Sequence, residues 1–342
     1  MVLRQDAVRE DSSSGAVTKP QRISGQPCLQ RIFCPRAACC EPIRLKLSFF
    51  SSDRTVLYRA AIKPFVDAVN ADAKGMLEIE VYFSGALGKD LSKQSQMVLD
   101  GVADIGYVIP AMTPDRFVDN AVIELPGLYR DVREASLVFS GLVAAQKLRG
   151  YDNFVVIGAY ATEPESIHVR PSIASLSDLR GKRIRVNNAF EAAAIEKLGM
   201  HPALLPINEA AEGISGGVID GATLPVTPMP ELGIGRVATN HYMLRTSAIP
   251  LLLLMNRSKF ASLPDNAEAI LRKYSGDCAV EHFIEVMEQL KSDPKRQVIA
   301  PSATDLKKAQ ITFDAVVGDF AAKRAGETLL RAVRAKIEEL HE

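Results

Sequence analysis

The alternation of apolar and polar residues predicts a first group of strands and helices in the N-terminal half of the chain. Residues 43–50 (IRLKLSFF) and 77–83 (LEIEVYF) alternate with a period of two, which is typical of strands. Between them, residues 58–69 carry apolar side chains at helical spacing. Asp90 is placed to cap a second helix that Gly101 closes. Alternating strands and helices predict a parallel sheet covered by helices on both faces.

The same cycle of strands and helices starts again near residue 151. Asn187 or Asn188 is placed to cap a helix that ends near Lys197. The two cycles together predict a two-lobed α/β protein with a helical C-terminus and a ligand cleft between the lobes. The predicted strands of this half are residues 154–157, 166–169, 183–186, 218–224 and 249–255, and the predicted helices at the end are residues 266–290 and 305–341.

The order of these elements also predicts where the two lobes begin and end. We expect lobe I to contain residues 43–162 and 251–290, and lobe II to contain residues 163–250 and 291–342. The 342-residue length agrees with two compact units rather than one.

Composition narrows the possible partners. The 41 basic residues balance the 41 acidic ones, so the surface gives no electrostatic reason to expect a nucleic acid or an anionic membrane. Trp is absent and aromatic residues make up 6%, so stacking platforms for bases are not indicated. The apolar run at residues 249–255 is far shorter than the roughly 20 residues of a membrane span, so it reads as a buried strand.

The first 42 residues show no helical or strand period and are rich in Ser, Gln, Arg and Pro. They contain no continuous apolar stretch of about 7–15 residues, as a secretory signal would need. We therefore expect this segment to be disordered or wrongly assigned. Four of the five cysteines lie here, at spacings that do not fit a zinc site, and only Cys278 lies in the body of the chain. A disulfide-stapled core is excluded and no metal site is expected.

The residue patterns of common enzymes are missing. The five histidines are scattered, and Ser215 lacks the GxSxG spacing of a nucleophile elbow. No GxGxxG or GxxxxGK[ST] loop is present to hold nucleotide phosphates. Cys278 lies in a helical pattern, which favours a core position over a nucleophile. We expect neither catalysis nor a cofactor.

Three groups of motifs, taken in order, identify a family resemblance. Residues 84–106 contain SGALGKDL and LDGVADIG, residues 113–128 contain TPDRF and ELPGL, and residues 177–225 contain SDLRGKRIRV, NE and GVIDGATLP. This ordered set resembles the periplasmic solute-binding proteins of TRAP transporters, the DctP-like family. The resemblance covers about residues 43–340 and implies a fold like that of periplasmic binding proteins.

The resemblance implies that Arg185, in the IRV segment, clamps the carboxylate of the ligand. The residue pattern agrees, because Arg185 ends a predicted strand, where open α/β sheets bind ligands. A guanidinium also presents a planar fork that matches a carboxylate. Strand alternation places Arg183 on the same side, so the pattern alone does not separate the two arginines.

The sequence departs from the family at two positions where many members carry polar ligand-binding residues. Many members carry a second arginine where this chain has Glu165, and Leu224 occupies a position that is often asparagine. A second ligand carboxylate near Glu165 would be repelled, so we expect a monocarboxylate with an apolar body rather than a dicarboxylate. Two other roles stay open for Glu165, which could accept a hydrogen bond from a ligand hydroxyl or amine, or face solvent. The remaining candidate ligand-binding residues are Tyr160, Asn187, Arg170, Ser51 and Tyr107, with Ser52 and Arg116 as weaker ones.

The leading hypothesis is an extracytoplasmic solute-binding protein that captures a small organic acid anion. The resemblance implies that it delivers this anion to TRAP membrane subunits from the periplasm. We expect it to act as a monomer. One alternative is a ligand-sensing module with the same fold that is coupled to a receptor. The other is an enzyme on the same two-lobed scaffold.

Overall fold

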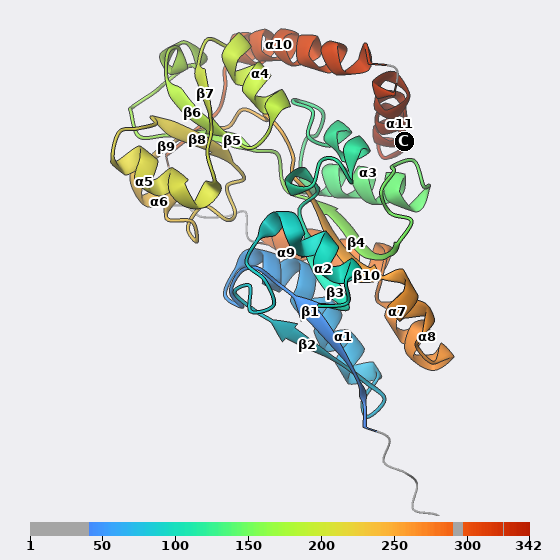
Figure 1. The fold of residues 1–342 in the computed structure, drawn as a ribbon. Coiled ribbons are helices and arrows are strands. Elements are labelled where there is room, and N and C mark those ends of the chain that lie inside the picture. Colours follow the sequence, from blue (N-terminus) through green and yellow to red (C-terminus); the bar gives the residue numbers. More distant parts are fainter. Residues whose placement is uncertain (1–40, 290–296, 324) are drawn as a thin grey trace, which may run out of the picture. The chain divides into compact units, whose positions relative to one another are not determined.

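The computed structural model describes residues 41–289, 297–323 and 325–342. Almost all of the segment that was predicted to be disordered or wrongly assigned lies outside the described residues, as do its four cysteines. In the described part, two β-sheets with helices packed on them form the body of the protein (Figure 1). We call the first sheet with its helices lobe I, and the second sheet with its helices lobe II.

The first sheet has five strands in the order β2-β1-β3-β10-β4. Strand β1 pairs in parallel with β2 and β3, whereas β10 is antiparallel to both of its neighbours. The parallel pairing predicted for the N-terminal strands is confirmed at β1, β2 and β3, whereas β10 re-enters lobe I from lobe II and so runs in the opposite direction. The strands are β1 (Ile43–Ser48), β2 (Leu77–Tyr82), β3 (Ile105–Val108), β4 (Phe154–Ala161) and β10 (Pro250–Asn256).

Both faces of the first sheet are buried, which the side chains of β10 show. Leu251, Leu253 and Met255 belong to one hydrophobic core, and the alternate residues Leu252 and Leu254 belong to another. A strand that is covered on both faces needs a continuous apolar run, and this run was predicted as a buried strand. The helical elements of lobe I are the π-helical turn η1 (Tyr58–Ile62), α1 (Lys63–Asp72), α2 (Gln94–Leu99), α3 (Val132–Ala144), α7 (Arg257–Ala261), α8 (Asp265–Lys273) and α9 (Asp277–Gln289).

The single helix predicted over residues 266–290 is interrupted. Helix α8 ends at Lys273 and α9 begins at Asp277. Between them Gly276 has a φ of +63°, a left-handed conformation that only glycine adopts without strain. Its backbone N–H donates to Ile157 O at 2.7 Å, so this turn is tied to β4.

The second sheet has six strands in the order β11-β9-β5-β8-β6-β7. Strand β6 is parallel to β7 and β8, and β5 is antiparallel to β8 and β9. The strands are β5 (Ser166–Val169), β6 (Arg183–Val186), β7 (His201–Leu204), β8 (Gly221–Leu224), β9 (Asn240–Tyr242) and β11 (Gln297–Ile299), and the helices are α4 (Ala189–Lys197), α5 (Ala210–Ser215) and α6 (Ile234–Val237).

Within the described residues, two segments that link the sheets are hydrogen-bonded to each other. We call residues 162–165 and 245–249 the crossing segments. The backbone N–H of Glu165 donates to Ser247 O at 2.7 Å, and that of Thr246 donates to Glu165 O at 3.0 Å. This pairing fixes Glu165 at the junction of the two lobes.

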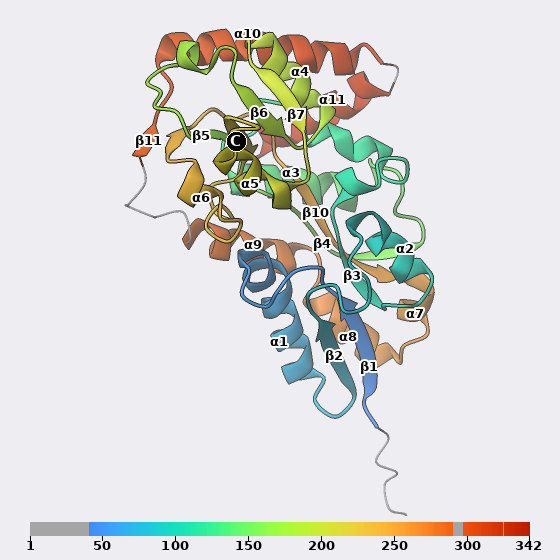
Figure 2. The same cartoon turned by 60° about the vertical axis from the view of Figure 1, so that its left-hand side comes forward.

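The last two helices, α10 (Ala303–Ala321) and α11 (Gly326–Glu339), replace the single predicted C-terminal helix. A Cβ at Gly326 would lie 2.1 Å from Phe320 O, so a glycine is needed where the chain turns. Helix α10 runs beside α4 and α11 lies beside α3, as both views show (Figures 1 and 2). The lobe boundaries given above stay a prediction, since these two helices pack on different lobes. No helix in the described ranges has the length and apolarity to cross a membrane.

Candidate functional site

Arg185 is the only buried arginine on β6, and backbone carbonyl groups hold its side chain. It is 4% exposed and lies between Ala203 of β7 and Ala222 of β8. Its Nε donates to Leu205 O at 2.8 Å and its Nη1 donates to Thr223 O at 3.5 Å. Nη2 has no partner among the described residues. The guanidinium is thus oriented by neutral acceptors and keeps donors for an anion.

Arg183 lies on the same strand and has a different role. Its side chain is 49% exposed, its Nη2 donates to Gly217 O at 2.6 Å, and its Nε lies 3.5 Å from a carboxylate oxygen of Asp220. This is a surface ion pair. The two arginines, which alternation could not separate, are separated by burial.

Glu191 lies beside Arg185 and accepts three hydrogen bonds. It is fully buried in the first turn of α4, where the N-cap Asn188 accepts from its backbone N–H. Its Oε2 accepts from Asn187 N at 3.0 Å and from Thr223 Oγ1 at 2.7 Å, and its Oε1 accepts from Thr246 Oγ1 at 2.7 Å. Glu191 therefore accepts more hydrogen bonds than Glu165, the acid that lies beside it.

Glu165 does not face solvent, which was one of its open roles. It is fully buried, its Oε1 accepts from Asn187 Nδ2, and its Oε2 has no hydrogen-bond partner in the described part of the chain. Burial raises the pKa of Glu165 well above its ordinary value, the Glu191 carboxylate raises it further, and the Arg185 guanidinium lowers it. The candidates Glu165, Asn187 and Arg185 therefore lie together at the lobe junction.

A third acid, Glu124, comes to the same place from lobe I. Its backbone carbonyl accepts from Ser247 Oγ at 2.8 Å, and the same hydroxyl accepts from Asn188 Nδ2 at 3.3 Å. Burial raises the pKa of Glu124 to about 8, with Glu191 adding to the shift. We call Glu124, Glu165 and Glu191 the glutamate cluster.

Leu224, the other departure from the family pattern, ends β8 and is 1% exposed. Its carbonyl oxygen lies 3.0 Å from His168 Nε2, and His168 Nδ1 lies 2.9 Å from His241 Nδ1. One nitrogen of the last pair must carry the proton while the other accepts. Leu224 faces an apolar cluster that also contains Ile219 and Met229.

The end of β1 carries a group of aromatic residues. Phe49 packs against Phe50, Tyr58 and Tyr107, with ring centroids 5.3, 6.2 and 5.5 Å apart. Tyr58 packs edge-on against Phe83 at 5.0 Å. We call these five residues the aromatic wall. The candidate Tyr107 belongs to it, with a fully buried hydroxyl that has no partner among the described residues, and Ser51 directly follows Phe50.

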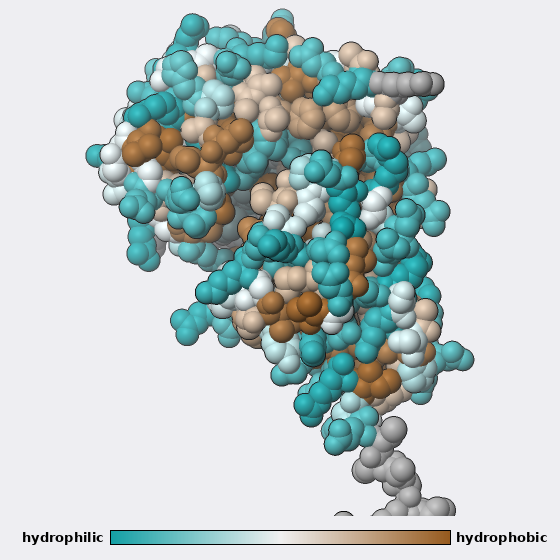
Figure 3. Space-filling model, viewed as in Figure 1, coloured by the Kyte–Doolittle hydropathy of each residue, from teal (hydrophilic) through white to brown (hydrophobic). Residues whose placement is uncertain are grey.

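A contact between two loops links the segment after β1 to the segment after β8. The loop after β1 reaches Val56, whose backbone N–H donates to Glu231 Oε1 at 2.7 Å. Glu231 belongs to the loop that follows Leu224, and its carboxylate also lies 3.9 Å from Arg59 Nη2. Figure 3 shows the surface hollowed between these two regions, with apolar and polar side chains at its edges.

Two candidates lie away from this group. Tyr160 is fully buried in the core of lobe I, where its ring lies 4.7 Å from that of Phe283 and its hydroxyl donates to Ala61 O at 3.4 Å. A Cβ at Gly158 would lie 2.0 Å from the Tyr160 hydroxyl, so the side chain lies back along β4. Arg170 follows the far end of β5, is exposed, and donates to Ser215 O at 3.2 Å.

The two weaker candidates are placed by local contacts. Ser52 O accepts from the backbone N–H and the hydroxyl of Thr55, which shapes the loop after β1. Arg116 donates to Gln96 Oε1 at 2.8 Å and lies over the Phe154 ring, 6.0 Å from its centroid. Both contacts are structural.

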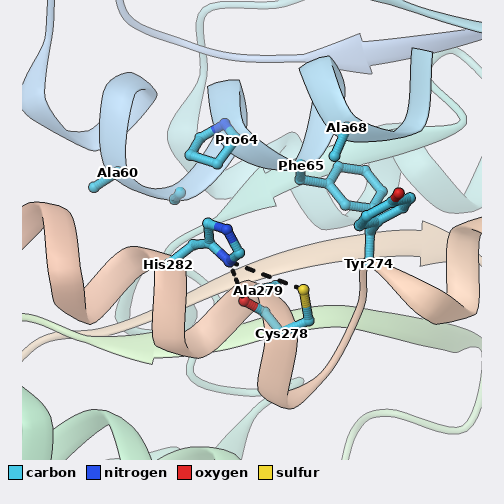
Figure 4. Close-up of a pocket in the computed structure, with 9 residues that line it drawn as sticks. Ala60, Pro64, Phe65, Ala68, Tyr274, Cys278, Ala279 and His282 are labelled. Atoms are coloured by element: carbon cyan, nitrogen blue, oxygen red, sulfur yellow. Dashed lines mark hydrogen bonds between the residues drawn. The ribbon is translucent and has the colours of Figure 1, made fainter. Parts of the chain in front are cut away.

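A separate small cavity of about 50 Å³ lies in lobe I between η1, α1 and α9. Figure 4 shows Cys278 and His282 on one wall, with Phe65 and Tyr274 beside them. His282 Nδ1 lies 2.8 Å from Cys278 O and 3.9 Å from its sulfur, one helical turn away. The volume suits one or two water molecules rather than an organic acid. Among the described residues, no group of three or more His, Cys, Asp or Glu side chains could hold a metal ion.

Sequence reasoning missed Glu191, Glu124 and Glu231. For Glu191 a signal existed, because Asn188 followed three residues later by a glutamate is the pattern of a capped helix start. Glu124 lies in the quoted ELP segment, but nothing in that segment shows that it is buried against lobe II. For Glu231 we find no local signal.

Comparison with known proteins gives the family. The model of the family described as bacterial extracellular solute-binding protein, family 7 (DctP), matches residues 47–323. A solute-binding protein of Verminephrobacter eiseniae is 22% identical over 208 residues, which are 60% of this chain and 62% of that protein. The match thus spans less than two thirds of this relative. The C4-dicarboxylate-binding periplasmic protein of Rhodobacter capsulatus is 20% identical over 308 residues, 87% of this chain and 92% of that protein.

A solved structure shows the same fold. A TRAP solute-binding protein from a marine metagenome, specific for aromatic acid ligands and crystallised with 3-hydroxybenzoate, superposes with a TM-score of 0.78. It is 23% identical, and the superposition covers 88% of this chain and 100% of that one. The predicted two-lobed α/β fold is confirmed, as is the resemblance that the motifs identified. Because the family match covers far more than half of its length, this chain belongs to the DctP family of bacterial extracellular solute-binding proteins.

Proposed function

We propose that this protein captures a small organic acid that has one carboxylate and an apolar, aromatic body. The observation that carries the proposal is the Arg185 guanidinium, which is 4% exposed, oriented by two carbonyl oxygens, and has Nη2 left to donate. A buried guanidinium needs an anion to offset its desolvation, and a ligand carboxylate supplies one with matching geometry. Asn187 lies beside it and contributes amide groups at the same end of β6.

The body of the acid is proposed to lie between Leu224 and the aromatic wall. The loops after β1 and β8 are in contact through Val56 and Glu231, so the ends of these strands face one another. Phe50, Tyr58 and Phe83 are only partly buried and offer aromatic faces and edges. Aromatic pairs contribute beyond the area that they bury, which favours an aromatic acid. The bound 3-hydroxybenzoate of the marine metagenome protein supports this ligand class.

A single carboxylate is proposed because the site has one buried cation and three buried acids. Arg185 is surrounded by Glu165 and Glu191, and Glu124 lies nearby. A second ligand carboxylate would be desolvated without a cationic partner. The R. capsulatus relative binds C4-dicarboxylates, so the family does not share one ligand class, and the exchange of an arginine for Glu165 is where this chain differs.

The protein is further proposed to act outside the cytoplasm as a monomeric binding subunit rather than as an enzyme. It would deliver the acid to the membrane subunits of a TRAP transporter. Family membership supports this role. No cofactor is invoked, because binding by one guanidinium and an apolar wall requires none.

Substitution of the arginine tests the proposal. Removal of one partner of a buried charge pair costs about 2–5 kcal/mol, so Arg185→Ala should weaken binding of 3-hydroxybenzoate by about 30-fold to several thousand-fold. Arg185→Lys should also bind poorly, because an ammonium cannot form the fork. Arg183→Ala is the matched control and should bind like the wild type. The measurement is isothermal titration calorimetry on folded proteins.

A thermal-shift screen of organic acids tests the ligand class, because a bound ligand raises the apparent stability by mass action. Aromatic monocarboxylates should give the largest shifts. Tightest binding of succinate or malate would contradict the ligand class and leave only the role of Arg185. Wild-type affinity in a folded Arg185→Ala protein would contradict the anchor itself.

A further inference from the structure

The charges at the lobe junction do not balance if every group is ionised. Glu124, Glu165 and Glu191 are 6%, 0% and 0% exposed, and the positive charge of Arg185 acts on Glu165. Three buried carboxylates and one guanidinium would leave an excess of two negative charges in a region closed to water. Buried charges without partners are expensive, so carboxyl groups in such places hold protons instead.

The hydrogen bonds distinguish Glu191 from Glu165. Glu191 accepts from a backbone N–H and from two threonine hydroxyls, at distances of 2.7 to 3.0 Å. These three donors stabilise its carboxylate form, and Arg185 adds a favourable charge. Glu165 accepts only from the Asn187 amide, its Oε2 accepts no hydrogen bond from the described residues, and a side-chain hydrogen bond with Glu191 favours its protonated form. An ionised Glu165 would place an unsolvated charge beside the charge of Glu191.

We propose that Glu165 is a specificity-determining residue that carries a proton when the acid is bound, so that the site presents one cation and one neutral carboxyl group. This inference deepens the proposed function and rests on it. The ligand carboxylate then pairs with Arg185 without an added negative charge on Glu165. The neutral carboxyl group offers an O–H donor and a C=O acceptor at the point where an arginine would favour a second carboxylate.

Every charged group that faces Glu165 acts on its proton in a known direction. Glu191 on α4 and Glu124 before α3 favour the protonated form, and Arg185 on β6 opposes it. A ligand carboxylate bound to Arg185 adds a negative charge. This charge offsets the positive charge of Arg185, which opposes the protonation of Glu165. Binding of the acid therefore holds the proton on Glu165 more tightly. By reciprocity, the proton on Glu165 tightens binding of the anion.

Infrared difference spectroscopy tests the protonation state directly. The spectrum of the wild type minus that of Glu165→Gln, at pH 7 with saturating benzoate, should contain the C=O stretch of a protonated carboxylic acid. Glu165→Asp should keep such a band. The matched control is Glu124→Gln. Burial of Glu124 also favours its protonated form, so this variant identifies the C=O band that belongs to Glu124 rather than to Glu165. A carboxylate stretch in place of the acid band in the Glu165 difference spectrum would overturn the proposal.

Calorimetry with benzoate gives an independent test. If Glu165 is neutral in the complex, the neutral isostere in Glu165→Gln should bind benzoate within about threefold of the wild type at pH 7. A Glu165 that stays ionised beside the anion predicts that Glu165→Gln binds at least about tenfold more tightly, since about 1.4 kcal/mol of repulsion would be removed. That result would reject the proposal.

The two experiments separate this inference from the proposed function. If the wild type does not bind benzoate or 3-hydroxybenzoate at all, the ligand class fails. The infrared difference spectrum is then recorded on the ligand-free protein, where the acid band of Glu165 is also expected. Its absence there would reject the neutral carboxyl group by itself.

Discussion

The two sheets bury different kinds of side chains. In lobe I, all six residues from Pro250 to Met255 of β10 are buried and apolar, and both faces of the strand are covered by hydrophobic cores. In lobe II, short strands bury polar groups, and these include His168, Arg185, Thr223 and His241. Strand β10 of lobe I is therefore stabilised by apolar burial, whereas the strands of lobe II also bury polar groups that need hydrogen-bond partners.

This difference indicates which lobe can supply the polar part of a ligand site. Buried polar groups cost free energy unless each has a partner, and the partners in lobe II come from several strands at once. Thr223 of β8 and Thr246 of the crossing segment both donate to Glu191 of α4. A ligand site can be built there because the polar groups are already oriented. In lobe I, the aromatic wall offers aromatic faces and edges and few polar groups.

The largest expected effect is on lobe I, from a cavity in its core. Leu253 is fully buried, so Leu253→Ala should lower the free energy of unfolding by about 2–5 kcal/mol. Binding by the folded fraction should change little, because Leu253 is not among the site residues. Urea unfolding measures the first quantity and calorimetry the second. Leu204→Ala is the control, since Leu204 is 67% exposed on β7 and its removal should change stability by less than about 0.5 kcal/mol.

An effect of comparable size that depends on pH is expected from Glu124. Its pKa is raised to about 8 by burial in the folded protein, while the unfolded chain has the ordinary value of 4.5. Below pH 4.5 both states are protonated and the stability from this group is complete. Between about pH 5 and 8 only the unfolded state ionises, so stability should fall by about 1.4 kcal/mol per pH unit. Above pH 8 this contribution levels off.

Glu124→Gln should make the slope smaller by the part that Glu124 contributes, because an amide does not titrate, while Glu165 keeps its own contribution. The measurement is urea unfolding of wild type and variant at several pH values from 5 to 8.5. Glu209→Gln, which changes an exposed acid, should keep the slope of the wild type. Identical slopes in wild type and Glu124→Gln would show that Glu124 is ionised in the folded protein.

The sequence predicted the parts of the fold that depend on local pattern. The run of β10 was found because a strand that is buried on both faces is continuously apolar. The strands β1 and β2 were found because a strand that is buried on one face alternates apolar and polar residues. The direction of β10 was missed, since it depends on the chain crossing from lobe II and not on any local residue. The breaks at Gly276 and Gly326 were also missed. In both places helical spacing continues while the backbone turns.

The site was predictable only in part for a related reason. A guanidinium at the end of β6 follows from the motif, but the separation of Arg185 from Arg183 depends on the carbonyl groups of Leu205 and Thr223. The exchange that produced Glu165 was visible in the sequence. Its partners were not, because Glu191 and Glu124 come from distant segments that meet only in the folded protein.

The smallest expected effect concerns the contact that joins the two lobes across the hollow. Glu231 Oε1 accepts from Val56 N at 2.7 Å and lies 3.9 Å from Arg59 Nη2, and its side chain is 27% exposed. A partly exposed hydrogen bond of this kind contributes about 0.5–1.5 kcal/mol, so Glu231→Ala should speed the release of bound acid by about two- to tenfold. The rate of association should change less, because encounter precedes closure of the loops.

Stopped-flow displacement of 3-hydroxybenzoate measures that release rate. The contact also links the lobe that carries the apolar core to the lobe that carries the polar site. Its loss should therefore change the kinetics of binding without a change in the stability of either core. Glu212→Ala, which removes an exposed acid of α5, should release the acid at the wild-type rate. A Glu231→Ala protein with unchanged release and reduced stability would show that this contact holds the fold together and does not retain the ligand.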